Sequence, residues 1–132
     1  MPRLSAAGYR FEPLVHPRAI VAASASIAAG AQIMAGAVVQ SGAQIAENVI
    51  VNTAAVVDHD CRIGRHAHVA PGAILCGNVD VGEGCYVGAG STIIQGIILG
   101  AGAFIGAGSV VIADVADGVR VTGAPAKVMS AR

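Results

Sequence analysis

A large aliphatic side chain recurs at every sixth position along most of this chain. Neither an α-helix of 3.6 residues per turn nor a strand with simple alternation returns to the same face every six residues over such a length. The repeat must therefore belong to a larger unit. All seventeen positions of the series hold only Val, Ile or Leu: Val15, Val21, Ile27, Ile33, Val39, Ile45, Val51, Val57, Ile63, Val69, Leu75, Val81, Val87, Ile93, Leu99, Ile105 and Val111.

Two further positions of each six-residue unit are restricted. The residue two places before the aliphatic is mostly small, as at Ala37 and Ser91. Positions i−2 and i of a strand point the same way, so each unit is predicted to be a short strand with two inward side chains. Three places after the aliphatic, Gly or Asn predominates, as at Gly36 and Asn48. These residues tolerate the positive φ that a sharp corner requires.

Strand and corner at this spacing predict an all-β fold, a parallel β-helix in which three units of six residues close one triangular coil. We expect about five to six such coils over residues 15–116. The spacing fails at Asp117, so residues 117–132 are expected to form a C-terminal extension.

Composition narrows the class of protein further. The formal net charge is zero, which argues against a nucleic-acid partner or a polybasic membrane surface. Polar residues interrupt every apolar window long enough to span a bilayer, and no secretory signal follows Met1, so a cytoplasmic protein is expected. Cys61, Cys76 and Cys85 are interpreted as reduced, buried residues and not as metal ligands or nucleophiles.

One outer face of the predicted prism is apolar. Residues just before the repeating aliphatics point outward, and steps of eighteen residues collect them into one column per face. The apolar column predicts a homotrimer, because such a stripe needs covering and closed symmetry suits a triangular section; the alternative is a cover supplied by another domain. This column contains Ile20, Val38, Val56, Ile74, Thr92 and Val110.

A histidine between two carboxylates stands out as a candidate catalytic group. His59 follows the apolar face directly and is flanked by Asp58 and Asp60. A histidine there can act as a general base near neutral pH, with a carboxylate fixing its tautomer. A solvated corner histidine with incidental acidic neighbours is the alternative, and spacing alone does not separate the two.

A second histidine, His68, lies half a coil from His59, with the filled core between them. The two can serve one site only if they come from adjacent subunits. Gly77 lies one coil above His59, and Ala89 and Ala107 leave room beside the wall that carries His68. No zinc site is expected, because the spacing of the four histidines along the chain does not match that of zinc ligands.

These segments resemble the sialic-acid O-acetyltransferase and nucleotide-amino-sugar N-acetyltransferase family. The resemblance covers nearly the whole chain, including Asn52-Thr53, Asp58-His59-Asp60-Cys61, His68, Cys76-Gly77-Asn78-Val79 and Gly123-Ala124-Pro125-Ala126-Lys127. It implies a left-handed β-helix and transfer of an acetyl group from acetyl-CoA to an amine or hydroxyl of a small sugar acceptor, expected to be a nucleotide-linked amino sugar.

The resemblance also implies roles for particular residues. His59 would be the general base and Asp60 would orient it. His68 and the Gly77 amide would meet the acetyl carbonyl, where the developing oxyanion needs donors. The remaining contacts to acetyl-CoA are expected from Asn52, Ala89, Ala107 and Lys127.

One departure from the family concerns its N-terminal nucleotide-binding domain. Residues 1–14 are too few for such a domain and resemble the connector that would follow one. Two other function classes stay open: an acetyltransferase of another small amine or alcohol, which needs the same base and CoA groove, and a non-catalytic β-helix scaffold, which needs neither.

Overall fold

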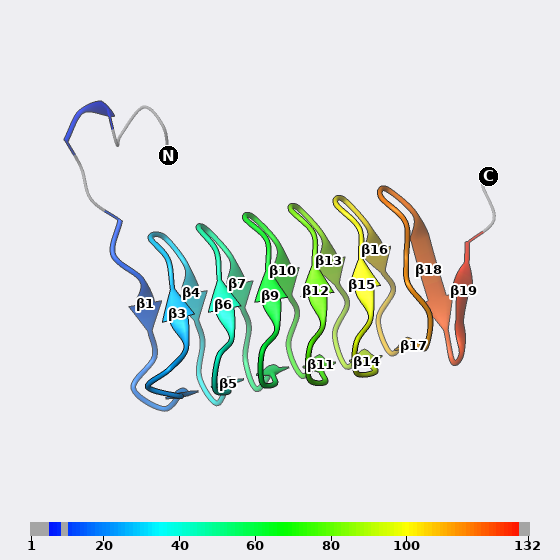
Figure 1. Cartoon of the computed structure of the whole chain (residues 1–132), viewed down its shortest axis with the longest axis horizontal. Helices are drawn as coiled ribbons and strands as arrows, with labels where there is room; N and C mark the ends of the chain where they lie inside the picture. Colours follow the sequence, from blue (N-terminus) through cyan, green and yellow to red (C-terminus); the bar gives the residue numbers. More distant parts are fainter. Residues whose placement is uncertain (1–5, 9–10, 130–132) are drawn as a thin grey trace.

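The computed structural model, which describes residues 6–8 and 11–129, is a parallel β-helix whose coils stack along one long axis (Figure 1). Three sheets form the walls of the prism. Sheet A holds β1 (Leu14–Val15), β4 (Gln32–Ile33), β7 (Ile50–Val51), β10 (His68–Val69), β13 (Tyr86–Val87), β16 (Phe104–Ile105), β18 (Arg120–Gly123) and β19 (Ala126–Val128). Sheet B holds β2 (Ile20–Val21), β5 (Val38–Val39), β8 (Val56–Val57), β11 (Ile74–Leu75), β14 (Thr92–Ile93) and β17 (Val110–Val111). Sheet C holds β3 (Ser26–Ile27), β6 (Gln44–Ile45), β9 (Arg62–Ile63), β12 (Asp80–Val81) and β15 (Ile98–Leu99).

Backbone hydrogen bonds between neighbouring coils fix the register. His68 pairs in parallel with Ile50 on one side and with Tyr86 on the other, a step of eighteen residues each way. The same step recurs in all three sheets, which confirms the coil of three six-residue units. Each strand from β1 to β17 is only two residues long, so stability comes from stacking many coils and not from any single strand.

The core is a column of inward side chains between the three walls. Every repeating aliphatic from Ile33 to Val111 is buried, whereas Val15 is 42% exposed and Val21 and Ile27 are partly exposed. The small residues two places earlier are buried as well, among them Ala37, Ala55 and Ala73. Because the large and small positions alternate around each coil, the interior fills without aromatic side chains.

From Gly30 to Gly108, the corners adopt the left-handed backbone conformation at the third residue after each aliphatic. Most of these residues are glycines, such as Gly36 with φ of 70°. Asn48, Asp60 and Asn78 take the same conformation with φ of 58°, and Asn and Asp tolerate it better than most residues. Ala54 and His66 also occupy it, so the coil geometry overrides local preference there.

The last coil is shorter than the others. Phe104 pairs with Arg120 and Ile105 with Val121, a step of sixteen residues in place of eighteen. Asp114 and Asp117 compensate for the shortening, because their carboxylates accept hydrogen bonds from the amides of Ile98 (2.8 Å) and Ala101 (2.9 Å). The parallel stacking thus continues past residue 116, and β19 then folds back antiparallel on β18.

In the described part of the chain, no helix has the length and apolar character needed to cross a bilayer.

Stacking predicts which glycines can be replaced. A Cβ on Gly82 would lie less than 3.0 Å from backbone atoms of Gly100 and Ala101 in the next coil. Gly82→Ala should therefore lower the free energy of unfolding by about 1–3 kcal/mol, the usual cost of forcing atoms into a packed site. Urea denaturation followed by circular dichroism measures this change.

Gly84→Asn is the matched control for Gly82→Ala. Gly84 has φ of 69° with no atom within 4 Å of an added Cβ, and Asn tolerates that conformation. Equal destabilisation by the two variants would contradict the close stacking of coils at Gly82.

Candidate functional site

His59 lies at the corner between β8 of sheet B and β9 of sheet C, on the coil that also carries Asp58 and Asp60. Its Nδ1 is 3.0 Å from Oδ2 of Asp60, and its backbone amide donates to Oδ1 of Asp58 at 2.7 Å. The two side chains of the His59–Asp60 pair are 45% and 60% exposed. Asp60 is itself the left-handed corner residue of this coil, and that conformation turns its carboxylate back toward the ring.

The carboxylate determines which nitrogen of His59 can take up a proton. A carboxylate accepts hydrogen bonds, so in neutral His59 the proton lies on Nδ1, facing Asp60. Nε2 then carries the free lone pair. This arrangement suits a general base, because an imidazolium formed by protonation at Nε2 is stabilised by Asp60.

Gly77 lies directly beside the free nitrogen of His59. A Cβ built on Gly77 would contact Nε2, Cε1 and Cδ2 of the His59 ring. The backbone of Gly77 is outside the left-handed region, since it is absent from the positive-φ residues of the described chain. Close approach of the imidazole, and not backbone conformation, is therefore the reason for glycine at this position.

His68 lies on the outer surface of sheet A, half a coil from His59. Its Nε2 is 3.1 Å from Nδ2 of Asn52, which lies one coil away at the end of β7. Oδ1 of Asn52 accepts hydrogen bonds from the Thr53 amide at 2.8 Å and the Thr53 hydroxyl at 3.3 Å. Burial lowers the pKa of His68, because desolvation disfavours the charged imidazolium.

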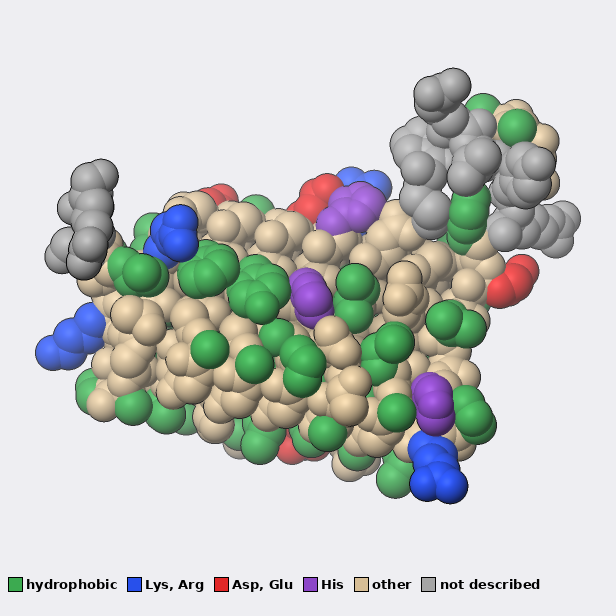
Figure 2. All heavy atoms as spheres, turned by 180° about the vertical axis from the view of Figure 1, so that it is seen from behind, with side chains coloured by type: hydrophobic (Ala, Val, Ile, Leu, Met, Phe, Trp, Pro, Cys, Tyr) green, Lys and Arg blue, Asp and Glu red, His purple; other side chains and the backbone are tan. Residues whose placement is uncertain are grey.

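The side chains of His68, Tyr86 and Phe104 form a row along the outer surface of sheet A, toward its C-terminal end. The Tyr86 ring meets His68 edge to face, with centroids 5.3 Å apart, and stacks on Phe104 at 5.2 Å. The guanidinium of Arg120 lies 4.6 Å from the Phe104 ring centre. Figure 2 shows this kind of row, hydrophobic side chains running along the molecule with a histidine among them.

His59 and His68 are not brought together within one chain. His59 belongs to the corner between sheets B and C, whereas His68 lies on sheet A, the opposite wall. Ala89 and Ala107 are exposed at the corners after β13 and β16, one above the other. Lys127 is exposed on β19, paired across to Thr122.

The remaining histidines and the cysteines play no visible part in a site. Within residues 6–8 and 11–129, no three His, Cys, Asp or Glu side chains gather as metal ligands would. The three cysteines are free. Cys61 and Cys85 are buried, as the sequence predicts, whereas Cys76 is only half-buried. Burial raises the pKa of Cys61 to about 11 and that of Cys85 to about 12, so both are unreactive thiols at neutral pH.

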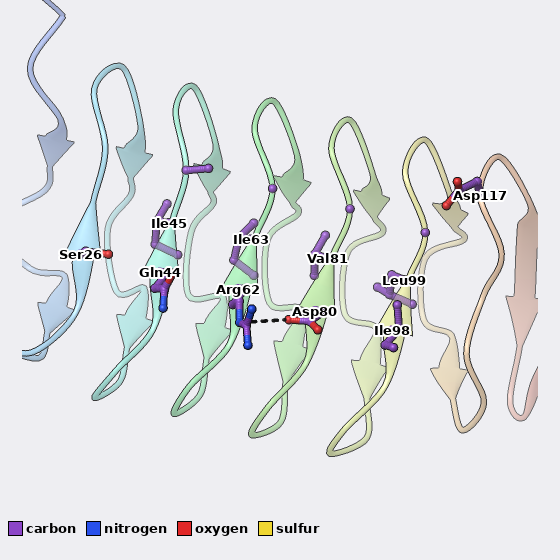
Figure 3. A pocket seen from close by; sticks show the side chains of 14 residues that line it. Ser26, Gln44, Ile45, Arg62, Ile63, Asp80, Val81, Ile98, Leu99 and Asp117 are labelled. Atoms are coloured by element: carbon purple, nitrogen blue, oxygen red, sulfur yellow. Dashed lines mark ion pairs between the residues drawn. The ribbon is translucent and has the colours of Figure 1, made fainter.

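A shallow groove crosses sheet C, away from both histidines (Figure 3). Arg62 and Asp80 form an exposed ion pair at 3.7 Å in it, and Ile98 adds an apolar patch. The groove is open to solvent, and an ion pair exposed in this way contributes little to the free energy of folding. It contains none of the groups expected to carry chemistry.

Two features of the site were not predicted from sequence. Thr53 contacts Asn52, and nothing in the spacing pointed to it, since the contact depends on a corner conformation. Ile94 and Ile112 are 39% and 53% exposed next to sheet B. They directly follow β14 and β17, so the eighteen-residue step could have found them as an extension of the apolar column.

Comparisons with known proteins agree with this architecture. Residues 60–95 and 78–113 match the family model described as bacterial transferase hexapeptide (six repeats). No curated protein gave a significant match. Among solved structures, the acetyltransferase domain of PglB from Neisseria gonorrhoeae is 44% identical with a TM-score of 0.95, and it has also been solved in complex with acetyl coenzyme A. The alignment covers 97% of this chain and 62% of that one.

Two further structures are similar over the same span. PerB from Caulobacter crescentus, in complex with CoA and GDP-perosamine, is 38% identical with a TM-score of 0.96, covering 98% of this chain and 62% of that one. WeeI from Acinetobacter baumannii is 29% identical with a TM-score of 0.93, covering 97% and 63%. This chain thus spans less than two thirds of the length of each relative. Its residues 60–113 match the bacterial transferase hexapeptide model, and nearly its whole length is similar to part of the PglB, PerB and WeeI structures.

Proposed function

We propose that this chain is the acetyl-CoA-dependent domain of an acetyltransferase that modifies the amine of a nucleotide-linked amino sugar. The observation that carries the proposal is the His59–Asp60 pair, at 3.0 Å, with its free Nε2 next to Gly77. Similarity to PglB and PerB supports the donor and the acceptor class, since those structures hold acetyl coenzyme A or CoA with GDP-perosamine. Variants of the Caulobacter enzyme with a histidine replaced by asparagine or alanine have also been solved.

The proposed reaction uses His59 as general base. The neutral sugar amine attacks the thioester carbonyl carbon, and Nε2 of His59 takes the proton that the nitrogen loses as the new bond forms. Asp60 stabilises the resulting imidazolium. The C–S bond then breaks, and the departing CoA sulfur receives the proton from His59, so that the amide, CoA and neutral histidine remain.

Developing negative charge on the carbonyl oxygen needs a donor already in place. The backbone amide of Asn78, next to Gly77, already donates to the His59 carbonyl at 2.9 Å. We assign the donors to the Gly77 amide and to His68, in keeping with the sequence expectation. Asn52, Ala89, Ala107 and Lys127 would contact the remainder of acetyl-CoA.

We further propose that the protein works as a homotrimer joined through sheet B. Its outward column is apolar, with Ile20 67% and Ile74 41% exposed, and Ile94 and Ile112 extend it toward the His59 corner. Covering such side chains gains about 25 cal/mol per Å². When sheet B faces a threefold axis, the His59 corner of one protomer adjoins the neighbour's corner between sheets A and B, which carries Asn52.

This arrangement would build each site from two chains. One chain would supply His59, Asp60 and Gly77, while the next would supply His68 and Asn52. The cytoplasm is the expected location, since acetyl-CoA would be the donor and the three cysteines are free, as is usual for a reducing compartment.

The trimer is tested by one charge in the outward column. Ile74→Asp should dissociate or unfold the protein, because it places a carboxylate in the proposed apolar interface. Ile98→Asp is the matched control: Ile98 holds the same strand position on sheet C and is 51% exposed. Light scattering should show a trimer for the wild type and for Ile98→Asp, but not for Ile74→Asp. A monomeric wild type would contradict the proposal.

His59→Ala should reduce turnover by a factor of about 10² to 10⁴, the range for loss of a general base. Release of free CoA thiol from acetyl-CoA and a panel of nucleotide-linked amino sugars measures turnover. Calorimetry should show acetyl-CoA affinity little changed. Wild-type protein that binds no acetyl-CoA would favour a scaffold, and activity only with other amines would redirect the acceptor class.

Mixed trimers test whether two chains share one site. Neither His59→Ala nor His68→Ala trimers should be active alone, but co-assembly gives some clefts an intact His59 from one chain and an intact His68 from another. Partial recovery of thiol release is expected. No recovery, once mass spectrometry has shown that the chains mixed, would contradict the shared site.

Gly77→Ala should reduce turnover nearly as much as His59→Ala, because the new methyl group would displace the His59 ring from its position. The fold should persist, since an alanine backbone is compatible with this corner. Gly90→Asn is the control, at a left-handed corner with φ of 68° and open space around it. Full activity of Gly77→Ala would show that the ring position observed is not the working one.

A further inference from the structure

The orientation of the Asn52 amide is fixed by its neighbour in sequence. The Thr53 backbone N–H lies 2.8 Å from Oδ1 of Asn52 and can only donate. The atom that faces it must therefore be the amide oxygen. The Thr53 hydroxyl donates to the same oxygen at 3.3 Å.

An amide held in this way presents its NH₂ group to His68. Nδ2 of Asn52 is 3.1 Å from Nε2 of His68. An NH₂ group has no lone pair to offer, so Nε2 must be the acceptor and cannot carry a proton. The proton of neutral His68 then lies on Nδ1, which has no hydrogen-bond partner among the described residues.

We propose that Asn52, anchored by Thr53, is a positioning residue that holds His68 as the neutral Nδ1–H tautomer and so leaves Nδ1–H as its free hydrogen-bond donor. This is the same tautomer that Asp60 imposes on His59, but the consequence is opposite. At His59 the open nitrogen is a base, whereas at His68 the open nitrogen is a donor.

The surroundings of His68 favour the neutral ring. Tyr86 on β13 packs against the ring at an interplanar angle of 84°, and Ile50 on β7 is its register partner on the other side. Neither these residues nor Asn52 is a carboxylate or an ammonium. Desolvation lowers the pKa of His68, so at neutral pH the amide contact with the unprotonated Nε2 is retained.

The inference rests on the proposed function only for its consequence. A donor at Nδ1 of His68 would hydrogen-bond the thioester carbonyl oxygen and would not compete with His59 for the amine proton. The tautomer itself is a property of the chain, so it can be tested without acetyl-CoA or an acceptor.

Nitrogen-15 NMR of the ¹⁵N-histidine-labelled protein tests the tautomer directly. At a pH well above the His68 pKa, Nδ1 should give a protonated, pyrrole-type resonance and Nε2 an unprotonated, pyridine-type one. Assignment comes from the resonances missing in His68→Gln. A protonated Nε2 in the wild type would overturn the inference while leaving the proposed acetyl transfer intact.

Two substitutions of Asn52 should change the spectrum in opposite ways. Asn52→Asp offers Nε2 a carboxylate in place of an NH₂ group, so Nε2 should become protonated, and the pKa of His68 should rise above its wild-type value. Asn52→Leu removes the constraint, so both tautomers should appear. Gln40→Glu adds the same charge at the equivalent corner position after β5 and should leave His68 unchanged.

Kinetics separate a positioning role from a structural one. Asn52→Leu should lower kcat about five- to tenfold, the scale of one hydrogen bond, with the circular dichroism spectrum and trimer size of the wild type. A wild-type kcat together with a mixed tautomer would refute the catalytic consequence. An unchanged tautomer in both Asn52 variants would refute the positioning role itself.

Discussion

The hydrogen-bonded register between coils is the constraint on which the rest of this structure depends. Each two-residue strand is too short to be stable alone. The backbone amides and carbonyls of one coil all find hydrogen-bond partners in the next coil when the two coils have the same number of residues. The eighteen-residue step satisfies this from β1 to β17. Where the step shortens to sixteen, the carboxylate of Asp114 replaces a backbone acceptor for the Ile98 amide and that of Asp117 adds a hydrogen bond from the Ala101 amide. One further coil then forms before the chain reverses at β19.

Constant register also explains how coils that carry no large loop between residues 14 and 111 can place side chains together. Side chains one coil apart lie in columns, so contacts form between residues that are far apart in sequence but equivalent in the repeat. Gly77 leaves space for the His59 ring from the coil below. Asn52 reaches His68 across one coil, and His68 rests on Tyr86 of the next.

The left-handed corners also contribute to the site, because one of them carries Asp60. The left-handed conformation is unfavourable for most residues other than glycine. Asp60 adopts it with φ of 58°, and its carboxylate lies against Nδ1 of His59. The same repeat that closes the coil thus places an acid beside a base. Gly42, in the coil below, leaves room for that carboxylate, because a Cβ there would contact Oδ1 of Asp60.

The sequence by itself determined the coil, the core and the columns, because a six-residue period repeated so many times is compatible with little else. It also identified His59, Asp60 and Gly77 as neighbours, since an eighteen-residue step is enough to place them. Tertiary structure decided what depends on side-chain direction. The Thr53 contact that orients Asn52, the tautomer it implies for His68, and the edge-to-face packing of Tyr86 depend on rotamers and corner dihedrals, which the spacing of residues does not specify. The shortened last coil also became visible only in the tertiary structure. There Val115 pairs with Leu99 and Val121 with Ile105, sixteen residues apart, so parallel pairing continues although the six-residue spacing has ended.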